Sequence, residues 1–237
     1  MNIIIHRGTH QIGGSVIEIS TASTRIVLDF GNELSLDEKY TSINLDINGV
    51  TKGIPDCDGI VISHYHMDHL GQLTSALPEI PLYMGELSKK IAIISAEYQD
   101  KDLYLRLLGA NTFHGGEAFT IGNIHIRPLV IDHSAADSYM FVIEAEGKRV
   151  LYTGDFRMHG LRHHILEKLV NTYIGEVDVL ITEGTSLSRD AEECISEAAV
   201  LEDISSYIQD GKYVFVMCSS TNIDRIMGIW QNMPTDK

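Results

Sequence analysis

The stretch that decides the fold runs from residue 59 to residue 69 and reads Gly-Ile-Val-Ile-Ser-His-Tyr-His-Met-Asp-His. It begins with a short apolar, β-branched run, which is typical of a buried strand. Three histidines and an aspartate follow within six residues, and burying them without a partner would cost free energy. Side chains alternate along extended backbone, so His64 and His66 point the same way. We therefore predict that His64, His66, Asp68 and His69 bind metal at the end of this strand.

Polar residues end other strands in the same way. Asp29, His133, Asp155 and Glu183 each follow an apolar run directly or after one or two residues. Ligands of layered α/β proteins bind outside the carboxyl ends of strands, so these side chains are predicted to converge on one site. We expect His133 and Asp155 to complete two neighbouring metal sites, with the Asp155 carboxylate bridging them.

This ligand set indicates the metal and the chemistry. Neutral imidazole and carboxylate groups suit zinc, and without nearby cysteines they also allow manganese or iron. Two metals about 3.5–4 Å apart can share and acidify a water molecule and stabilise a leaving group. We therefore predict two divalent ions, zinc first and manganese second, that serve hydrolysis. The other histidines are interpreted as ordinary surface or core residues: His6, His10, His114, His125, His159, His163 and His164.

Composition limits the class of protein. The chain has 237 residues, of which 44% are hydrophobic, enough for a sizeable core. Its net charge of −15 counts against unspecific nucleic-acid binding, although metal ions in a cleft can reverse the local field. The three cysteines are widely spaced and indicate reduced thiols. No segment has the length of a signal peptide or a membrane span, so we expect a cytoplasmic protein with no membrane partner.

The order of apolar runs indicates an α/β protein. The runs predict strands at 3–5, 16–19, 25–28, 59–62, 124–131, 140–144, 149–152, 177–182 and 213–217. Helical patterns cover 87–108 and 193–209. The polar stretch 184–192 between them is predicted to lie near a domain boundary.

The residues from His64 to His69 match the HxHxDH signature of the metallo-β-lactamase superfamily. The stretch Ile-Val-Leu-Asp-Phe-Gly at 26–31 resembles the first motif of that superfamily, in which Asp29 has a structural role. His133 and Asp155 fall where later metal ligands of the superfamily belong. The resemblance covers essentially the whole chain and implies the metallo-β-lactamase fold, an αββα sandwich.

Four stretches resemble the β-CASP branch of this superfamily, especially ribonuclease J-like proteins. They are His-Ser-Ala-Ala-Asp-Ser-Tyr at 133–139, Thr-Gly-Asp-Phe-Arg at 153–157, Thr-Glu-Gly-Thr at 182–185, and the segment 214–225. The resemblance implies a metallo-β-lactamase domain over 1–192 and the N-terminal segment of a β-CASP α/β domain over 193–237. The family continues with two more histidine motifs, so the sequence reads as incomplete at its C-terminus. The last metal ligand and the general acid stay open.

The leading hypothesis is hydrolysis of RNA, in which metal-bound hydroxide attacks phosphorus. Asp68 is then both ligand and proton acceptor, and Asp155 and Glu183 are the other catalytic carboxylates. Three residues are candidates for holding phosphate, with a purely structural turn as the alternative: Ser134, Ser138 and Arg157.

Two other functions stay open. A small thioester, lactone or other acyl substrate would suit the acidic surface better than RNA. A catalytically silent metal-binding fragment is the second alternative. An incomplete β-CASP segment would leave edge strands and an apolar helix face exposed, which predicts a homodimer or another association.

Overall fold

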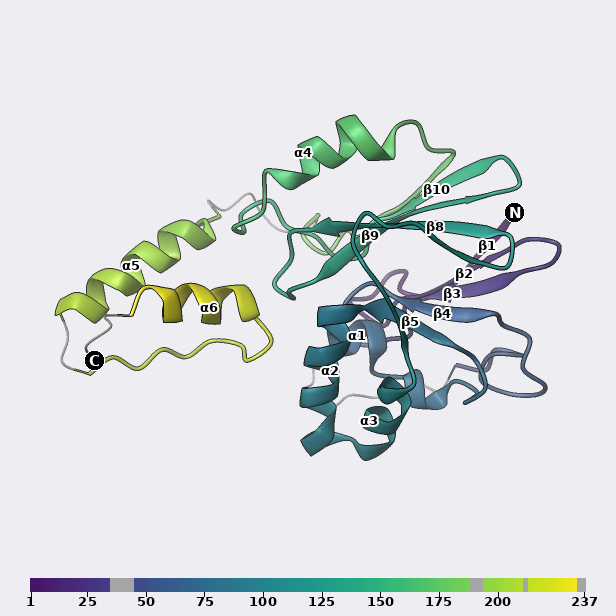
Figure 1. Ribbon diagram of the computed structural model, residues 1–237, viewed down its shortest axis with the longest axis horizontal. Coiled ribbons are helices and arrows are strands. Elements are labelled where there is room, and N and C mark those ends of the chain that lie inside the picture. The colour runs from purple at the N-terminus through teal and green to yellow at the C-terminus, as the bar shows by residue number, and fades with distance from the viewer. Residues whose placement is uncertain (35–44, 188–193, 211–212, 234–237) are drawn as a thin grey trace.

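The computed structural model describes residues 1–34, 45–187, 194–210 and 213–233, and its main body is a four-layer sandwich (Figure 1). Six strands of the described chain form the first sheet in sequence order: β1 (Asn2–Arg7), β2 (Val16–Ser20), β3 (Arg25–Leu28), β4 (Gly59–Ile62), β5 (Leu82–Gly85) and β6 (Asn111–Phe113). The first three strands are antiparallel, and β3 to β6 run parallel.

The second sheet packs against the first. Its order is β11 (Val179–Ile181), β10 (Lys148–Tyr152), β9 (Ser138–Ala145), β8 (Ile124–Ile131) and β7 (Phe119–Ile121). The pairs are antiparallel except β10 with β11, which are parallel. Because β4, β8 and β10 end at the same side of the sandwich, the polar residues that follow them can meet there.

Helices cover the outer face of each sheet (Figure 1). On the first sheet lie α1 (Met67–Leu70), a 3₁₀ turn (Leu73–Ser75), α2 (Glu86–Gln99) and α3 (Lys101–Leu108). On the second lie α4 (Ile165–Leu169) and a π-helical turn (Val170–Ile174). The predicted αββα sandwich is confirmed.

Three apolar cores separate the four layers. Alternate residues of β3 show this division: Ile26 and Leu28 pack between the sheets, whereas Val27 faces the layer of α2 and α3. A third core, which includes Leu151 and Leu169, joins the second sheet to α4. Every residue of β4 is buried, as expected for a parallel strand with both faces covered.

The helix predicted over 87–108 is two helices. Asp100 separates them, and its carboxylate accepts hydrogen bonds from the backbone N–H groups of Asp102 and Leu103. Such N-capping stabilises a new helix start and turns the chain. The prediction of one helix was therefore wrong. The apolar pattern of the sequence continues across the break and does not reveal it.

Helices α5 (Glu197–Asp210) and α6 (Ile223–Gln231) lie beside the sandwich (Figure 1). They pack closely on each other. At Gly228 of α6 the helices are so near that an added Cβ atom would lie 2.5 Å from the side chain of Leu201 of α5. The strand predicted over 213–217 is wrong for the described chain, where these residues pair with no neighbouring strand. A β-branched run becomes a strand only beside a partner backbone, and the sequence does not show that partner.

The predicted boundary between residues 192 and 193 lies outside the described residues, as does Glu193, where the second helix was predicted to begin. The two-domain division therefore stays a prediction. In the part of the chain that the structure describes, no helix is long and apolar enough to cross a bilayer.

Candidate metal centre

The residues at the end of β4 and the start of α1 lie against the turn that follows β3. Gly31 makes this contact possible, because a Cβ atom there would lie 1.6 Å from the carbonyl oxygen of Asp68. The backbone N–H of Phe30 donates to the carbonyl of His69 at 2.7 Å. This close packing fixes Asp68 and His69 relative to the end of β3.

Three loops bring the predicted ligands together. His64 and His66 lie in the β4–α1 turn and His69 lies in α1, whereas His133 follows β8 and Asp155 follows β10. In the described chain, two groups of ligand atoms lie close enough to hold metal: those of His64, His66 and His133, and those of His64, His69 and Asp155. Within each group, all the atoms lie within 4.8 Å of one another.

The distances fit metal coordination. Nδ1 of His66 lies 3.2 Å from Nε2 of His64 and 3.2 Å from Nε2 of His133. Nitrogens bound to one tetrahedral zinc at about 2.0–2.1 Å lie about 3.3 Å apart. Both distances from His66 therefore match the spacing of ligands to a single ion.

Asp155 lies between the two groups. One carboxylate oxygen lies 3.2 Å from Nε2 of His69, and the other lies 3.8 Å from Nε2 of His133. Asp68 approaches the same nitrogen of His69 at 3.7 Å. All six predicted ligands are thus neighbours, and the two oxygens of Asp155 face different histidines.

Asp29 holds residues of the site through its carboxylate. Its carboxylate accepts hydrogen bonds from the N–H and Oγ–H of Ser63 at 2.7 and 2.8 Å, and from the Tyr152 hydroxyl at 2.5 Å. Nδ1 of His69 lies 2.7 Å from the same carboxylate. Such a partner fixes the tautomer of a histidine ligand and leaves Nε2 for the metal.

Burial sets the protonation of the histidines. Burial and the neighbouring imidazoles lower the pKa of His64 well below its usual value. The same causes lower the pKa of His66 to about 4, and burial lowers that of His133 to about 3. These three imidazoles are therefore neutral at pH 7, the form that binds metal.

His69 differs from the other three. Burial alone would lower its pKa, but the charge of Asp29 and the hydrogen bonds to Asp155 and Asp29 raise it well above the usual value. Burial would raise the pKa of Asp155, but the hydrogen bond to His69 and the charge of that protonated imidazole lower it. Without metal, His69 and Asp155 thus form a charged pair in which the imidazole holds the proton that an incoming cation would displace.

The remaining predicted residues lie around this centre rather than in it. Glu183 accepts a hydrogen bond from the backbone N–H of Phe156 at 3.0 Å, which holds the turn after Asp155. Ser138 donates its hydroxyl to the carbonyl of Ala135 at 2.9 Å. Arg157 pairs with Asp132 at 2.9 Å and with Glu197 at 3.1 Å. Ser134 is half-buried beside His133.

Four supporting residues are not predicted from the sequence, because each has the pattern of an ordinary strand or turn residue: Ser63, Tyr65, Asp132 and Tyr152. One signal was available: Asp132 directly precedes His133 at the end of a buried strand, where a carboxylate needs a partner.

A cleft of about 370 Å³ opens beside the centre. His66 and Asp68 line one side, and Ser95 and Gln99 of α2 line another. The turn at 220–221 closes part of it. Substrate bound in this cleft would contact two of the candidate ligands.

Comparison with known proteins agrees with the geometry. The family model of the beta-lactamase superfamily domain matches residues 24–206. An RNase J-like protein of Methanocaldococcus jannaschii is 26% identical over 223 residues, which cover 89% of this chain and 49% of the relative. Ribonuclease J of Helicobacter pylori is 24% identical over 244 residues, covering 92% and 33%. Cleavage and polyadenylation specificity factor 73 of Drosophila melanogaster is 28% identical over 193 residues, covering 74% and 27%.

A crystal structure of a protein of unknown function from Enterococcus faecalis V583 has the same fold. It superposes with a TM-score of 0.82 at 20% identity, over 98% of this chain and 63% of that chain. The chain spans about half or less of the length of the curated relatives above. The fold and the match over residues 24–206 show that the chain belongs to the metallo-β-lactamase superfamily, with ribonuclease J-like proteins among its relatives.

Proposed function

We propose that the chain is a metal-dependent phosphodiesterase that hydrolyses RNA with two divalent ions, zinc or manganese. The observation that carries the proposal is the position of Asp155, whose two oxygens face His69 of one ligand group and His133 of the other. A carboxylate in that position can bridge two metals. Relatives named as ribonucleases support RNA as the substrate.

In this proposal the ions and the residues of the chain have different roles. Divalent ions bound here would acidify water and polarise a phosphoryl oxygen. Asp29 holds the Nδ1–H of His69, so that Nε2 stays directed at the centre. Asp68 lines the cleft, from which its carboxylate can accept a proton. Glu183 acts through the turn after Asp155 rather than on the substrate.

Of the three candidates for phosphate contact, two have polar atoms engaged within the protein. Two nitrogens of Arg157 are already paired, and the Ser138 hydroxyl is donated to the backbone, which favours the structural alternative for both residues. We retain Ser134 as the better candidate for contact with a phosphate oxygen.

The acyl-hydrolase alternative has one specific observation in its favour. No lysine or arginine lines the described cleft, and the net charge of the chain is −15. RNA would therefore depend on the metal ions for electrostatic attraction, whereas a small neutral ester would not.

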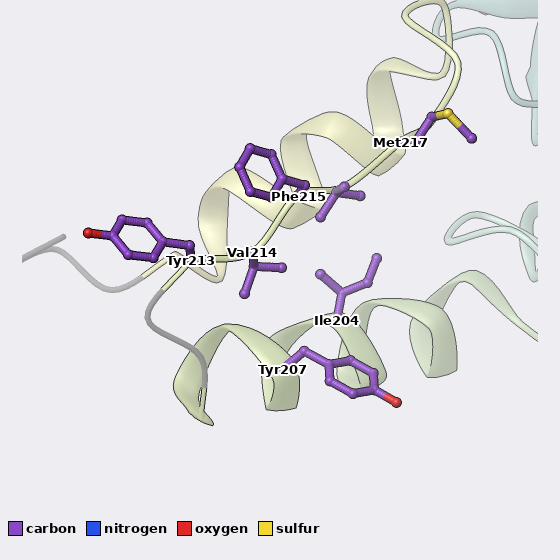
Figure 2. A pocket seen from close by; sticks show the side chains of 7 residues that line it. Ile204, Tyr207, Tyr213, Val214, Phe215 and Met217 are labelled. Carbon is purple, nitrogen blue, oxygen red and sulfur yellow. The ribbon is translucent and has the colours of Figure 1, made fainter.

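We also propose that the chain associates through residues 213–217. Phe215 and Met217 are 96% and 100% exposed. Figure 2 shows Val214 and Ile204 of α5 pointing toward one another across a hollow, whereas Phe215 points away from α5. The extended backbone of this apolar segment pairs with no described strand and is suited to pairing with a second copy.

Metal content and turnover test the proposed function together. Elemental analysis should give two metal ions per chain, and the same sample should cleave labelled single-stranded RNA with added zinc or manganese. Bis(p-nitrophenyl) phosphate and a thioester are assayed in parallel. Metal binding with cleavage of the thioester alone would favour the acyl alternative, and metal binding without any turnover would favour the silent fragment.

A further inference from the structure

A network of hydrogen-bonded acidic and basic side chains joins the candidate metal centre to the C-terminal helices. Asp132, which directly precedes His133, accepts a hydrogen bond from Nε of Arg157 at 2.9 Å. Nη1 of Arg157 donates to Glu197 at 3.1 Å. Glu197, at the start of α5, in turn accepts hydrogen bonds from Nε of Arg225 of α6, at 3.0 Å, and from Nη2 of the same guanidinium.

The central residues of this network are buried. Glu197 is 2% exposed and Asp132 is fully buried, and the Arg157 side chain is 9% exposed. Burial alone would raise the pKa of Glu197, but its hydrogen bond to Arg225 and the charges of Arg225 and Arg157 lower it. The carboxylate is therefore ionised, and removing its charge would leave Asp132 as the one acidic partner of Arg157 among the described ion pairs.

Arg157 lies two residues after Asp155, so its position affects the turn that bears this ligand. The backbone N–H of Arg157 donates to the carbonyl of Asp132 at 2.8 Å, which joins the turns that bear Asp155 and His133. The second oxygen of Asp132 accepts from the backbone N–H of Arg162 at 2.7 Å. Glu197 thus contacts, through one guanidinium, the place where both ligand-bearing turns meet.

A second contact joins the same two parts of the chain. The Tyr65 hydroxyl donates to the carbonyl of Thr221 at 2.7 Å and accepts from the backbone N–H of Ala136 at 3.0 Å. Tyr65 lies between His64 and His66 in the sequence. The turn before α6 therefore contacts the loops that carry the histidines as well.

We propose that Glu197 is a positioning residue that couples the packing of α5 and α6 to the geometry of the metal ligands His133 and Asp155. The inference rests on the proposed metal-binding function. It assigns to the C-terminal helices an effect on metal affinity even though neither helix supplies a candidate ligand among the described residues.

The test compares Glu197→Gln with Glu202→Gln, which changes an exposed glutamate on the same helix. Zinc affinity is measured by calorimetry at a temperature where circular dichroism shows both variants folded. We expect Glu197→Gln to weaken zinc binding about 10-fold, since loss of groups that orient metal ligands typically costs 10–100-fold. The absorption spectrum of the Co²⁺-loaded protein should also change, because it reports ligand geometry and does not respond to a loss of stability alone.

Arg225→Gln provides an independent variant, because it keeps the pair between Glu197 and Arg157 while removing the connection to α6. We expect a smaller loss of affinity, and an effect of the double variant below the sum of the two. Native zinc affinity and a native Co²⁺ spectrum in Glu197→Gln would overturn the inference and leave the proposed function standing. Failure of the unaltered chain to bind zinc or manganese would overturn both.

Discussion

The carboxylate of Asp29 lies 2.7 Å from Nδ1 of His69, and the two residues are 40 positions apart in the sequence. Asp29 has a backbone φ of 56°, a left-handed conformation that asparagine also tolerates. Asp29→Asn therefore removes the charge while leaving the backbone unstrained, and it isolates the effect of the carboxylate on its four hydrogen-bond donors.

We expect Asp29→Asn to weaken zinc binding about 10- to 100-fold, because His69 would lose the partner that fixes its tautomer. The free energy of unfolding should fall by about 1.5–3 kcal/mol, the usual contribution of a hydrogen bond to a buried charged group. Calorimetry and urea unfolding measure the two quantities. Asp203→Asn, at an exposed position of α5, is the control. Equal zinc affinity in both variants would contradict the role given to Asp29.

His133→Ala should reduce the bound metal from the proposed two ions per chain to one or fewer, because His133 belongs to the first ligand group and faces Asp155. Elemental analysis after dialysis measures this directly. The matched control is His125→Ala, which removes an exposed histidine from β8, the strand that His133 follows. Both variants should have the same secondary structure by circular dichroism. Retention of two metals in His133→Ala would mean that the ligand set is wrong.

The cysteines should react at different rates with a thiol reagent. Burial raises the pKa of the Cys57 thiol to about 11, so about one molecule in a thousand carries the reactive thiolate at pH 8. Cys194 is exposed. We expect Cys194 to be labelled rapidly at pH 8 and Cys57 only at higher pH or after unfolding, as mapped by mass spectrometry of peptides. Labelling of both at one rate in the folded protein would show that Cys57 is accessible.

Phe215→Ser should reduce self-association, since it removes a fully exposed aromatic ring from the segment proposed to pair with a second copy. Ile54→Ser changes a similarly exposed apolar residue in a loop of the sandwich and should have no effect. Light scattering over a range of concentrations gives the molecular mass of both. A monomer at all concentrations for the unaltered chain would refute the proposed association.

Local signals in the sequence were enough to predict much of the fold. The strands at 25–28, 59–62 and 124–131 have the predicted bounds, because each ends in apolar residues that a polar residue follows directly. The short strands β5, β6 and β7 were missed. They contain three or four residues each, and their pairing partners, rather than their own composition, make them strands.

The site was predictable to a similar degree. Each predicted metal ligand lies next to another, because the carboxyl ends of strands converge in this class of fold. The contacts of Arg157 and Ser138 could not be predicted, since they depend on Glu197 and on the carbonyl of Ala135, and neither contact leaves a pattern in the sequence.

The candidate ligands come from both sheets: His64 follows β4 of the first sheet, whereas His133 and Asp155 follow β8 and β10 of the second. The centre can therefore form only after the two sheets have docked, late in folding, because contacts between residues so distant in sequence require the closure of long loops. A metal ion held there would act as a cross-link between the layers. It would lower the unfolding rate far more than it raises the folding rate. The metal-loaded protein would therefore remain folded because it unfolds slowly, as well as because its folded state has the lower free energy.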